Sequence, residues 1–563
     1  MPTSWYQVIP IVLHEIQSLQ PRSVLDVGIG FGKYGMLIRE ALEVPLGRYY
    51  KHQWQIKVDG VEVFSGYKNP IHEHCYDRVY YGDILSLVGE LPSYDVILLI
   101  DVLEHFDKGA GTSLLQKLVN HTNKCLLVST PLYPASQGAF LGNAHEAHQS
   151  RWILTDFLDF DFSYQLMPIG DNGAQLIAVF PTQCKQEKPK EVNEYPVEAS
   201  GKNEPLTVGY ILPHKNLTGG LKMLLEQMRQ LHNRGHRVIA LGKTGKNSQV
   251  LPEWFPIQVD EEIAVPQGKS YRDYLDCCDV VMAGWVSQIP ELMDTDTPVV
   301  YWEQGHEWMF GECGDLSFNS PVRQHLAQCY QLPCYLAAVS PIVARILKVR
   351  YGRDASVIPN GIDTDIYQPG KRPDDGTILL VGNPALRFKG FDVALKALQK
   401  VWNHGFRFKV KWVCQAEPKV QGASYPVTFI VSPSQGQLAE HYRTSDIFLF
   451  TSWYEGFGMP PLEAMASGVP VVATQCGGIE TYAVPGENAL MADPGDIDSL
   501  AYAVMYLLQH PEAREVLAQR GRETALKFSA SKTIGLLEDY LRRVVITHKQ
   551  RAKSEPGARQ AGS

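Results

Sequence analysis

The sequence predicts an α/β protein of several domains, each built on a largely parallel sheet. The chain has 563 residues, which is too long for one hydrophobic core. Strand-like apolar runs alternate with helical runs, and glycine-rich or acidic turns follow several of the strands. We expect domains at 1–182, 206–355 and 356–547, a flexible linker at 183–205 and a disordered tail at 548–563.

The composition is that of an ordinary soluble protein. Hydrophobic residues make up 45% and charged residues 20%, and the net charge of −9 argues against a nucleic-acid surface. No stretch approaches the roughly 18 uninterrupted apolar residues of a spanning helix, and the first residues lack the features of a secretory signal. We therefore expect a cytoplasmic protein without a nucleic-acid partner, and peripheral contact with a membrane stays open.

The first domain opens with a helix, a strand and a glycine-rich turn. The turn has the spacing Asp-x-Gly-x-Gly-x-Gly, whereas a dinucleotide-binding turn would have Gly-x-Gly-x-x-Gly. Glycines let the backbone turn tightly and approach a ligand, and the following helix N-terminus favours a polar or negative group. The residues of the turn are Asp26, Gly28, Gly30 and Gly32. Three later strands also end in acidic residues, namely Glu62, Asp83 and Asp101.

This spacing resembles motif I of the class I S-adenosylmethionine-dependent methyltransferases, and the strand order along the chain is similar. The resemblance implies a Rossmann-like domain at residues 1–182 with S-adenosyl-L-methionine as the methyl donor. It also implies that Glu62 accepts the ribose hydroxyls, that Asp83 lies near the adenine and that Asp101 stands at the carboxyl end of the fourth strand.

Titratable side chains follow the fifth strand, where a methyl acceptor would bind. A histidine there can take a proton from a hydroxyl, because its ordinary pKa is near 6.5. The candidates are His105, His145 and His148. Three alternatives stay open: positioned binding without a base, a metal bound by His145, Glu146 and His148, and a lid helix with polar faces. We assign no metal ligand.

The domain at 206–355 begins with a βαβ unit. The strand from Leu206 to Leu212 leads through Gly219 and Gly220 into a helix, and these glycines would let backbone amides approach a ligand. A later strand runs into a polar and aromatic loop that contains His306.

The domain at 356–547 carries two further strand-end motifs. The strand from Thr377 to Gly382 precedes Arg387 and Lys389, whose cations suit a diphosphate. After the strand from Asp446 to Thr451, two glutamates stand eight positions apart across a turn and a short helix. The residues of this motif are Glu455, Gly456, Phe457, Gly458 and Glu463.

This motif resembles the Glu-x7-Glu signature of the retaining glycosyltransferases of family four, which have the GT-B fold of two Rossmann-like domains. The resemblance implies a nucleotide-sugar donor. It implies that Glu463 binds the ribose, that Glu455 and His306 lie by the donor sugar, and that Gly219 and Gly220 approach its diphosphate. Lys389, and after it Arg387, would stabilise the leaving nucleoside diphosphate, so that this step needs no metal.

Together the two resemblances predict a bifunctional enzyme that transfers a sugar to a glycan or lipid-linked acceptor and methylates a sugar, most simply on oxygen. In a second hypothesis the N-terminal domain is a binding or scaffolding module without turnover. A third is a GT-B phosphorylase, which would use free phosphate in place of a nucleotide.

Overall fold

The computed structural model divides into two compact units. The first comprises Met1–Glu187 together with Glu307–Gln324, and the second comprises Lys188–His306 and His325–Ser563. The structure describes residues 4–132, 137–140, 142–169, 173–181, 204–216, 218–243, 249–312, 321–418 and 423–554. The predicted linker at 183–205 lies outside these ranges except for its last two residues.

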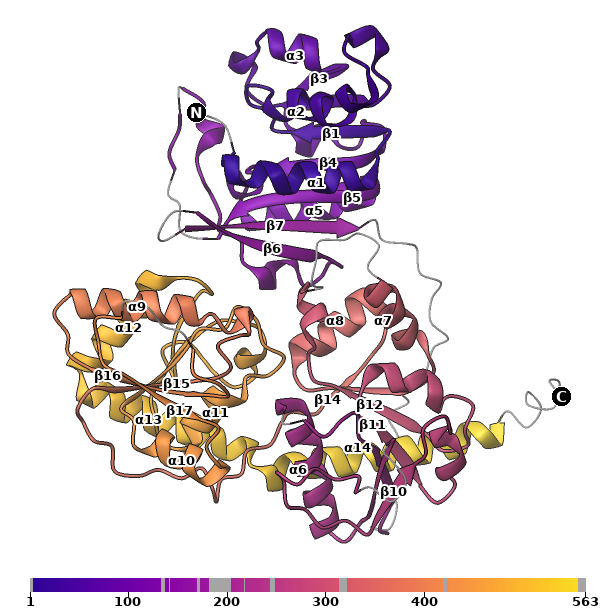
Figure 1. The fold of residues 1–563 in the computed structure, drawn as a ribbon, viewed down its shortest axis with the longest axis vertical. Coiled ribbons are helices and arrows are strands. Elements are labelled where there is room, and N and C mark those ends of the chain that lie inside the picture. The colour runs from indigo at the N-terminus through magenta and orange to yellow at the C-terminus, as the bar shows by residue number, and fades with distance from the viewer. Residues whose placement is uncertain are drawn as a thin grey trace. The chain divides into compact units, whose positions relative to one another are not determined.

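The first unit is built on a seven-stranded sheet of order β3-β2-β1-β4-β5-β7-β6 (Figure 1). The first five strands pair in parallel, and β7 is antiparallel to both of its neighbours. The strands are β1 (Ser23–Val27), β2 (Lys57–Glu62), β3 (Arg78–Tyr81), β4 (Tyr94–Ile100), β5 (Thr122–Pro131), β6 (Ser163–Ile169) and β7 (Gly173–Pro181). The five parallel strands confirm the alternation predicted from the sequence, whereas the β6–β7 hairpin was not predicted.

Helices pack on this sheet through their apolar faces. Helix α1 buries Val12 and Ile16 in one core with Ile38 of α2 and Val96 of β4. On α5, Leu114 and Leu118 are fully buried. The helices of this unit are α1 (Ile9–Leu19), α2 (Lys33–Leu42), α3 (Pro70–Cys75), α4 (Ile84–Leu87) and α5 (Lys108–His121).

The segment Glu307–Gln324 clusters with the first unit, although the sequence predicted it within the domain at 206–355. The carbonyl of Gly311 accepts a hydrogen bond from the Tyr164 N–H at 3.2 Å. A Cβ built on Gly311 would lie 2.7 Å from the ring of Phe162, so this backbone lies directly on the ring. An ion pair of 2.9 Å joins Arg323 to Asp161. The expectation of two parts that fold independently on either side of the linker is therefore wrong in its boundaries.

The second unit contains two sheets in which every described strand pairing is parallel. The first has the order β10-β9-β8-β11-β12-β13-β14 and the second the order β17-β16-β15-β18-β19-β20. The first sheet contains β8 (Thr207–Ile211), β9 (Arg237–Lys243), β10 (Glu261–Val265), β11 (Val280–Ala283), β12 (Val299–Glu303), β13 (Tyr335–Ala338) and β14 (Ser356–Val357). The second contains β15 (Thr377–Val381), β16 (Lys409–Cys414), β17 (Val427–Val431), β18 (Ile447–Phe450), β19 (Val471–Thr474) and β20 (Leu490–Ala492).

These two parallel sheets match the two Rossmann-like domains expected of a GT-B fold. The helices are α6 (Gly219–Asn233), α7 (Pro321–Gln331), α8 (Pro341–Tyr351), α9 (Phe391–Asn403), α10 (Gln435–Arg443), α11 (Met459–Ala466), α12 (Ile497–Gln509), α13 (Pro511–Ala525) and α14 (Ala530–Ser554). Helix α11 begins with prolines in its first turn, as the sequence predicts. In the described part of the chain, no helix is both long and apolar enough to cross a membrane.

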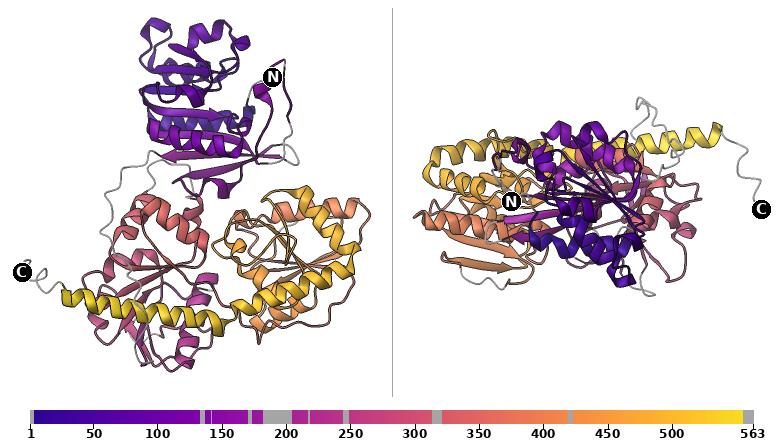
Figure 2. Two further views of the ribbon diagram at one scale, coloured as in Figure 1. Left: turned by 180° about the vertical axis from the view of Figure 1, so that it is seen from behind. Right: turned by 90° about the horizontal axis from the view of Figure 1, so that it is seen from above.

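Helix α14 returns from the second sheet of this unit to the first, as the yellow ribbon in Figures 1 and 2 shows. The Tyr540 hydroxyl donates to the Leu336 carbonyl at 2.9 Å, and Glu538 pairs with Arg234 at 2.7 Å. The predicted domain at 356–547 therefore ends in a helix that packs on the preceding domain. The predicted tail is also too long, because residues 548–554 continue α14 and residues 555–563 lie outside the described residues.

The packing of α14 predicts a large effect for Leu541→Ala. Leu541 is fully buried, so the truncation leaves a cavity and should lower the free energy of unfolding by about 2–5 kcal/mol. Leu536→Ala on the same helix is the matched control, because Leu536 is 50% exposed and its loss should cost under about 0.5 kcal/mol. Chemical denaturation together with hydrogen exchange of the α14 amides measures both variants, and equal effects would contradict this packing.

Candidate active sites

A pocket of about 310 Å³ opens in the first unit. It lies where the strand order reverses between β1 and β4, and ligands of open α/β sheets bind at such a reversal. Nearly all of the predicted cofactor residues and all three candidate histidines line it: Asp26, Gly28, Gly30, Glu62, Asp83, Asp101, His105, His145 and His148. Gly32 is not a lining residue and instead caps α2 with φ +86°.

The glycines of the first turn are required by backbone geometry. Gly28, Gly30 and Gly32 all have positive φ, at 73°, 52° and 86°. A Cβ at Gly28 would also lie 2.5 Å from the side chain of Val102. The sequence therefore places glycine where an L side chain would be strained.

Asp26 titrates near neutral pH. Burial raises its pKa to about 7, although a hydrogen bond from Tyr76 opposes this rise. The Tyr76 hydroxyl donates to Asp26 Oδ2 at 2.6 Å. The sequence analysis did not identify Tyr76, because it lies outside the motifs at the strand ends.

Glu62 and Asp83 each accept hydrogen bonds from nearby backbone N–H groups. The carboxylate of Glu62 accepts from the N–H groups of Gly30 and Phe64, both at 2.9 Å, so it fixes the glycine turn while lining the pocket. Asp83 caps α4 by accepting from the Leu85 N–H at 2.9 Å. Burial raises the pKa of Glu62 despite these backbone hydrogen bonds.

Asp101 adopts a left-handed backbone conformation with φ +54°, which is uncommon for an aspartate. Its Oδ1 accepts from the Ser129 hydroxyl at 2.8 Å and from the Gln175 amide. Such strained residues cluster at functional sites, because the surrounding structure must hold them. Burial raises the pKa of Asp101 above its usual range.

Of the three candidate histidines, two meet. The rings of His105 and His148 lie 5.0 Å apart edge to face, and Glu104 stands beside them. Burial is the main cause that lowers the pKa of His105, so this imidazole is neutral at pH 7. The alternative metal trio of His145, Glu146 and His148 is wrong in its members, because Glu146 instead accepts from the Tyr67 hydroxyl at 3.0 Å.

The second unit brings Lys389 and Glu455 together. Lys389 follows β15 and Glu455 follows β18, the two strands at which the order of their sheet reverses. Lys389 Nζ donates to Glu455 Oε1 at 2.7 Å, and the Ser452 hydroxyl donates to the same oxygen at 2.9 Å. The Arg387 side chain is exposed and forms no hydrogen bond or ion pair with the described residues. The geometry thus favours Lys389 over Arg387.

Glu463 is held firmly by tyrosines. It is 5% exposed, and its two oxygens accept from the hydroxyls of Tyr367 and Tyr442, each at 3.0 Å. Lys222 of α6 lies 3.4 Å from Oε1. The carboxylate is therefore fixed in direction, with a cation from the preceding domain beside it.

Backbone contacts at Gly456 join the two sheets of this unit. The Gly456 carbonyl accepts from the Ser340 hydroxyl at 2.6 Å, and a Cβ on Gly456 would lie 2.1 Å from the Gln304 carbonyl oxygen. The Gln304 amide in turn donates to the Gly220 carbonyl at 3.2 Å. These contacts bring the predicted motifs after β8, β12 and β18 to one place. Gly219 stands beside them as the first residue of α6, and a Cβ on it would meet nothing within 4 Å.

The rest of the turn serves packing. Phe457 is 3% exposed and its ring lies 5.3 Å from that of Tyr482, so its side chain is not available to a ligand. The sequence predicts Phe457 among the substrate-binding residues, and the structure places its side chain in the core. Gly458 has φ +82° and its carbonyl accepts from the Tyr482 hydroxyl.

His306 is positioned by Glu303, which the sequence analysis missed. Glu303 is fully buried and its Oε1 lies 2.8 Å from His306 Nδ1, while Oε2 accepts from the Tyr330 hydroxyl. Burial alone would raise the pKa of Glu303, but His306 and hydrogen bonds from Tyr330 and Gly305 lower it to about 2. The ionised carboxylate therefore holds the imidazole against Trp285, whose ring is 4.4 Å away.

Comparisons with known proteins identify the family of one part of the second unit. Residues 362–524 match the family model described as Glycosyl transferases group 1, so this part of the chain is a group 1 glycosyltransferase domain. The chain is 30% identical over 202 residues to the MMP alpha-(1->4)-mannosyltransferase of Mycolicibacterium hassiacum, which covers 33% of this chain and 49% of the relative. It is 28% identical over 226 residues to the D-inositol 3-phosphate glycosyltransferase of Mycolicibacterium smegmatis, covering 37% and 51%.

The chain thus spans about half the length of these curated relatives. Among solved structures, sucrose-phosphate synthase from Thermosynechococcus elongatus aligns with 61% of this chain and 99% of its own, at 17% identity and a TM-score of 0.48.

The contact at Gly456 predicts that Gly456→Ala disturbs the loop of Gln304 and Gly305. The added methyl would collide with a backbone oxygen, which cannot move like a side chain, so the free energy of unfolding should fall by about 1–3 kcal/mol. Gly436→Ala in α10 is the control, because its Cβ would meet nothing and alanine favours a helix. Thermal unfolding of both variants tests this, and a neutral Gly456→Ala would rule out so close an approach.

Proposed function

We propose that the second unit transfers a sugar, with retention, from a nucleotide-sugar to a glycan, lipid-linked or small-molecule acceptor. The observation that carries this proposal is the pairing of Lys389 with Glu455 at the strand reversal of a group 1 glycosyltransferase domain. The ammonium of Lys389 is preorganised where a departing nucleoside diphosphate gains negative charge. Glu455 keeps that ammonium in place and presents its second oxygen to the donor sugar.

Three further features support the binding of a nucleotide-sugar. Glu463 is fixed by two tyrosine hydroxyls, so it can accept from the ribose without losing side-chain freedom on binding. Gly219 begins α6 in open space, which leaves the helix N-terminus accessible to a diphosphate. His306 is oriented by Glu303 and is a candidate ligand of the donor sugar.

The names of the relatives suggest which donors and acceptors to test first. One relative is named for transfer of mannose and the other for D-inositol 3-phosphate as acceptor. The test incubates the protein with GDP-mannose, UDP-glucose and UDP-N-acetylglucosamine, with and without D-inositol 3-phosphate, and measures the release of nucleoside diphosphate. Release from at least one donor is expected. No release or transfer with any donor, or a reaction supported only by free phosphate, would contradict the proposal.

Lys389→Ala should lower kcat by about 10²–10³ with the donor that the panel identifies, because a preorganised charge is lost in the transition state. Arg387→Ala is the matched control two residues away, and the exposed Arg387 should leave kcat within about threefold of the native protein. Steady-state kinetics with a thermal-unfolding check measures both. The reverse ranking would assign the leaving-group role to Arg387.

For the first unit we propose methylation of a sugar, on oxygen, from S-adenosyl-L-methionine. The proposal is supported by a pocket that gathers three buried acidic side chains, Asp26, Glu62 and Glu104, and the half-buried Asp101 at a strand reversal. S-adenosyl-L-methionine carries an ammonium and a sulfonium, and it supplies the methyl group when bound. Carboxyl groups buried without enough positive charge favour a cationic ligand of this kind.

The residues of the chain have separate roles in this proposal. The glycine turn allows close approach, Glu62 and Asp83 receive the ribose and adenine, and Asp101 and Asp26 face the cationic groups. His105, His145 and His148 are the candidates for taking the proton of the acceptor hydroxyl. A binding module without turnover is the second candidate, and it would bind S-adenosyl-L-methionine yet transfer no labelled methyl group to any glycan.

The pKa of Asp26 predicts how the affinity for S-adenosyl-L-methionine depends on pH. A cationic ligand prefers the ionised carboxylate, so the affinity should rise as pH increases through about 7 and level off above it, with a slope of up to about tenfold per pH unit below. Asp26→Asn should flatten this dependence, because its side chain does not titrate. Calorimetry at pH 6, 7 and 8 measures both proteins, and parallel curves would show that Asp26 is not the titrating group.

A further inference from the structure

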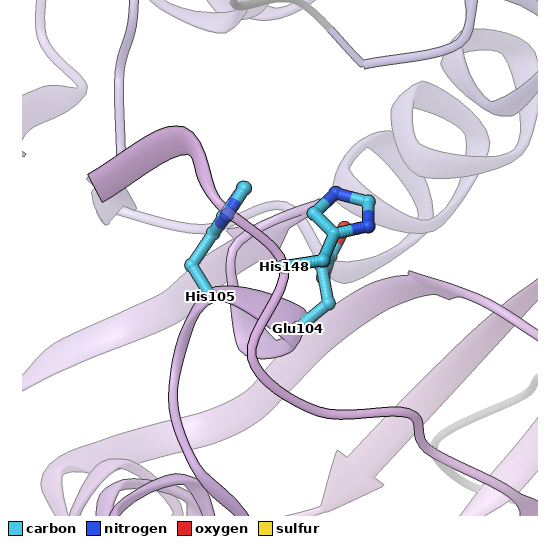
Figure 3. A group of neighbouring side chains, drawn as sticks. All are labelled: Glu104, His105 and His148. Atoms are coloured by element: carbon cyan, nitrogen blue, oxygen red, sulfur yellow. The ribbon is translucent and has the colours of Figure 1, made fainter. Parts of the chain in front are cut away.

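Three side chains of metal-ligating type meet at one side of the pocket in the first unit (Figure 3). Glu104 and His105 belong to the short helix η5 (Leu103–His105), which follows β4, and His148 comes from the segment after β5. One donor atom from each residue lies within 4.8 Å of the others. Among the described residues, no other group of three His, Cys, Asp or Glu side chains has this arrangement.

The two segments that carry these side chains are joined by their backbones. The Glu104 carbonyl accepts from the N–H groups of Gln149 and Ser150, at 2.8 and 3.1 Å. His105 Nδ1 lies 3.3 Å from the Ala147 carbonyl, which can only accept a hydrogen bond, so Nδ1 carries the proton. The lone pair of His105 is then on Nε2. A backbone partner of this kind on one ring nitrogen is typical of metal-ligating histidines.

The carboxylate of the group lacks a positive partner. Glu104 is 2% exposed, and the Thr130 hydroxyl donates to its Oε2 at 3.2 Å. Within the described ranges, no lysine or arginine forms an ion pair with it. A buried carboxylate without a cation is costly, and a metal ion is one of the partners that removes this cost.

We propose that Glu104, His105 and His148 bind one divalent cation of the Mn²⁺, Fe²⁺ or Zn²⁺ type. Two imidazoles and one carboxylate suit these borderline cations better than Ca²⁺ or Mg²⁺, which prefer oxygen ligands throughout. Three protein ligands leave coordination positions open toward the pocket.

The role of the cation rests on the methylation proposed above. Its open positions receive hydroxyl oxygens of the acceptor and so hold the acceptor beside the donor pocket. With His105 and His148 as ligands, His145 remains the candidate for taking the hydroxyl proton. The cation therefore specifies an acceptor class, namely sugars whose hydroxyl groups can coordinate a metal.

The test measures metal binding without any methyl transfer. The full chain is treated with a chelator, dialysed and titrated with Mn²⁺, with free Mn²⁺ followed by electron paramagnetic resonance, and the titration is repeated with Zn²⁺ by calorimetry. One equivalent should bind in the native protein. Glu104→Gln and His148→Ala should each weaken binding by at least about 100-fold, since even changes to the groups that support ligands cost about 10–100-fold.

His145→Ala is the matched control, because His145 lines the same pocket but is not one of the three ligands. It should bind the metal like the native protein. Glu104 is buried, so if Glu104→Gln unfolds, the half-buried His148→Ala decides the result. Unchanged affinity in His148→Ala, or equal losses in His148→Ala and His145→Ala, would overturn the proposed site.

The binding of S-adenosyl-L-methionine is measured on the same variants to keep the two proposals apart. If the metal binds as expected but S-adenosyl-L-methionine does not, the cation site stands and the methylation proposal fails. If S-adenosyl-L-methionine binds while neither Mn²⁺ nor Zn²⁺ binds to the native protein, the cation site fails alone.

Discussion

Among the parallel strands of each of the three sheets the strand order reverses once, and this constraint decides where ligands can bind. Where two neighbouring parallel strands send their connections to opposite faces of a sheet, their carboxyl ends leave a crevice that no connection fills. The reversals lie between β1 and β4, between β8 and β11, and between β15 and β18. The pocket of the first unit opens at the first reversal, and the pair of Lys389 and Glu455 stands at the third. Side chains from distant parts of the sequence therefore meet because of strand order alone.

The sites differ in their electrostatics in a way that matches the ligands proposed for them. The first unit places Asp26, Glu62 and Asp101 in one pocket, and burial raises the pKa of each. This favours a ligand with positive charge. The second unit offers ammonium groups, with Lys389 on Glu455 and Lys222 near Glu463. These cations lie beside carboxylates that hold them in place, and they favour a diphosphate. The two proposals thus assign a cationic ligand and an anionic ligand to separate sheets of one chain.

The strand-end motifs were predictable because they depend on local patterns. An apolar run followed by glycines or an acid marks both a strand end and a candidate ligand, which is why Asp26, Glu62 and Glu455 were found. Tyr76 was not found, because it donates to Asp26 fifty positions away and only the fold brings the two together. Glu303 and Glu104 stand next to candidate histidines in the sequence, but their burial and their contacts are seen only in the fold. Phe457 was predicted to bind substrate, whereas its side chain packs in the core. The last turns of α14 were predicted as a disordered tail because their residues are polar. The fold shows that they continue a helix whose Tyr540 contacts β13.

The segment Glu307–Gln324 has a consequence for how this chain can be made. It belongs to the first unit, yet it is encoded after β12 and begins about 125 residues beyond the end of that unit's sheet. During synthesis the N-terminal sheet can assemble early. The contacts of Gly311 with the ring of Phe162 and the N–H of Tyr164 form only after the ribosome has passed residue 324. A gene cut in the linker would give two fragments of which neither is complete. The two units are thus interlaced in the sequence, and part of the second must be translated before the first is complete.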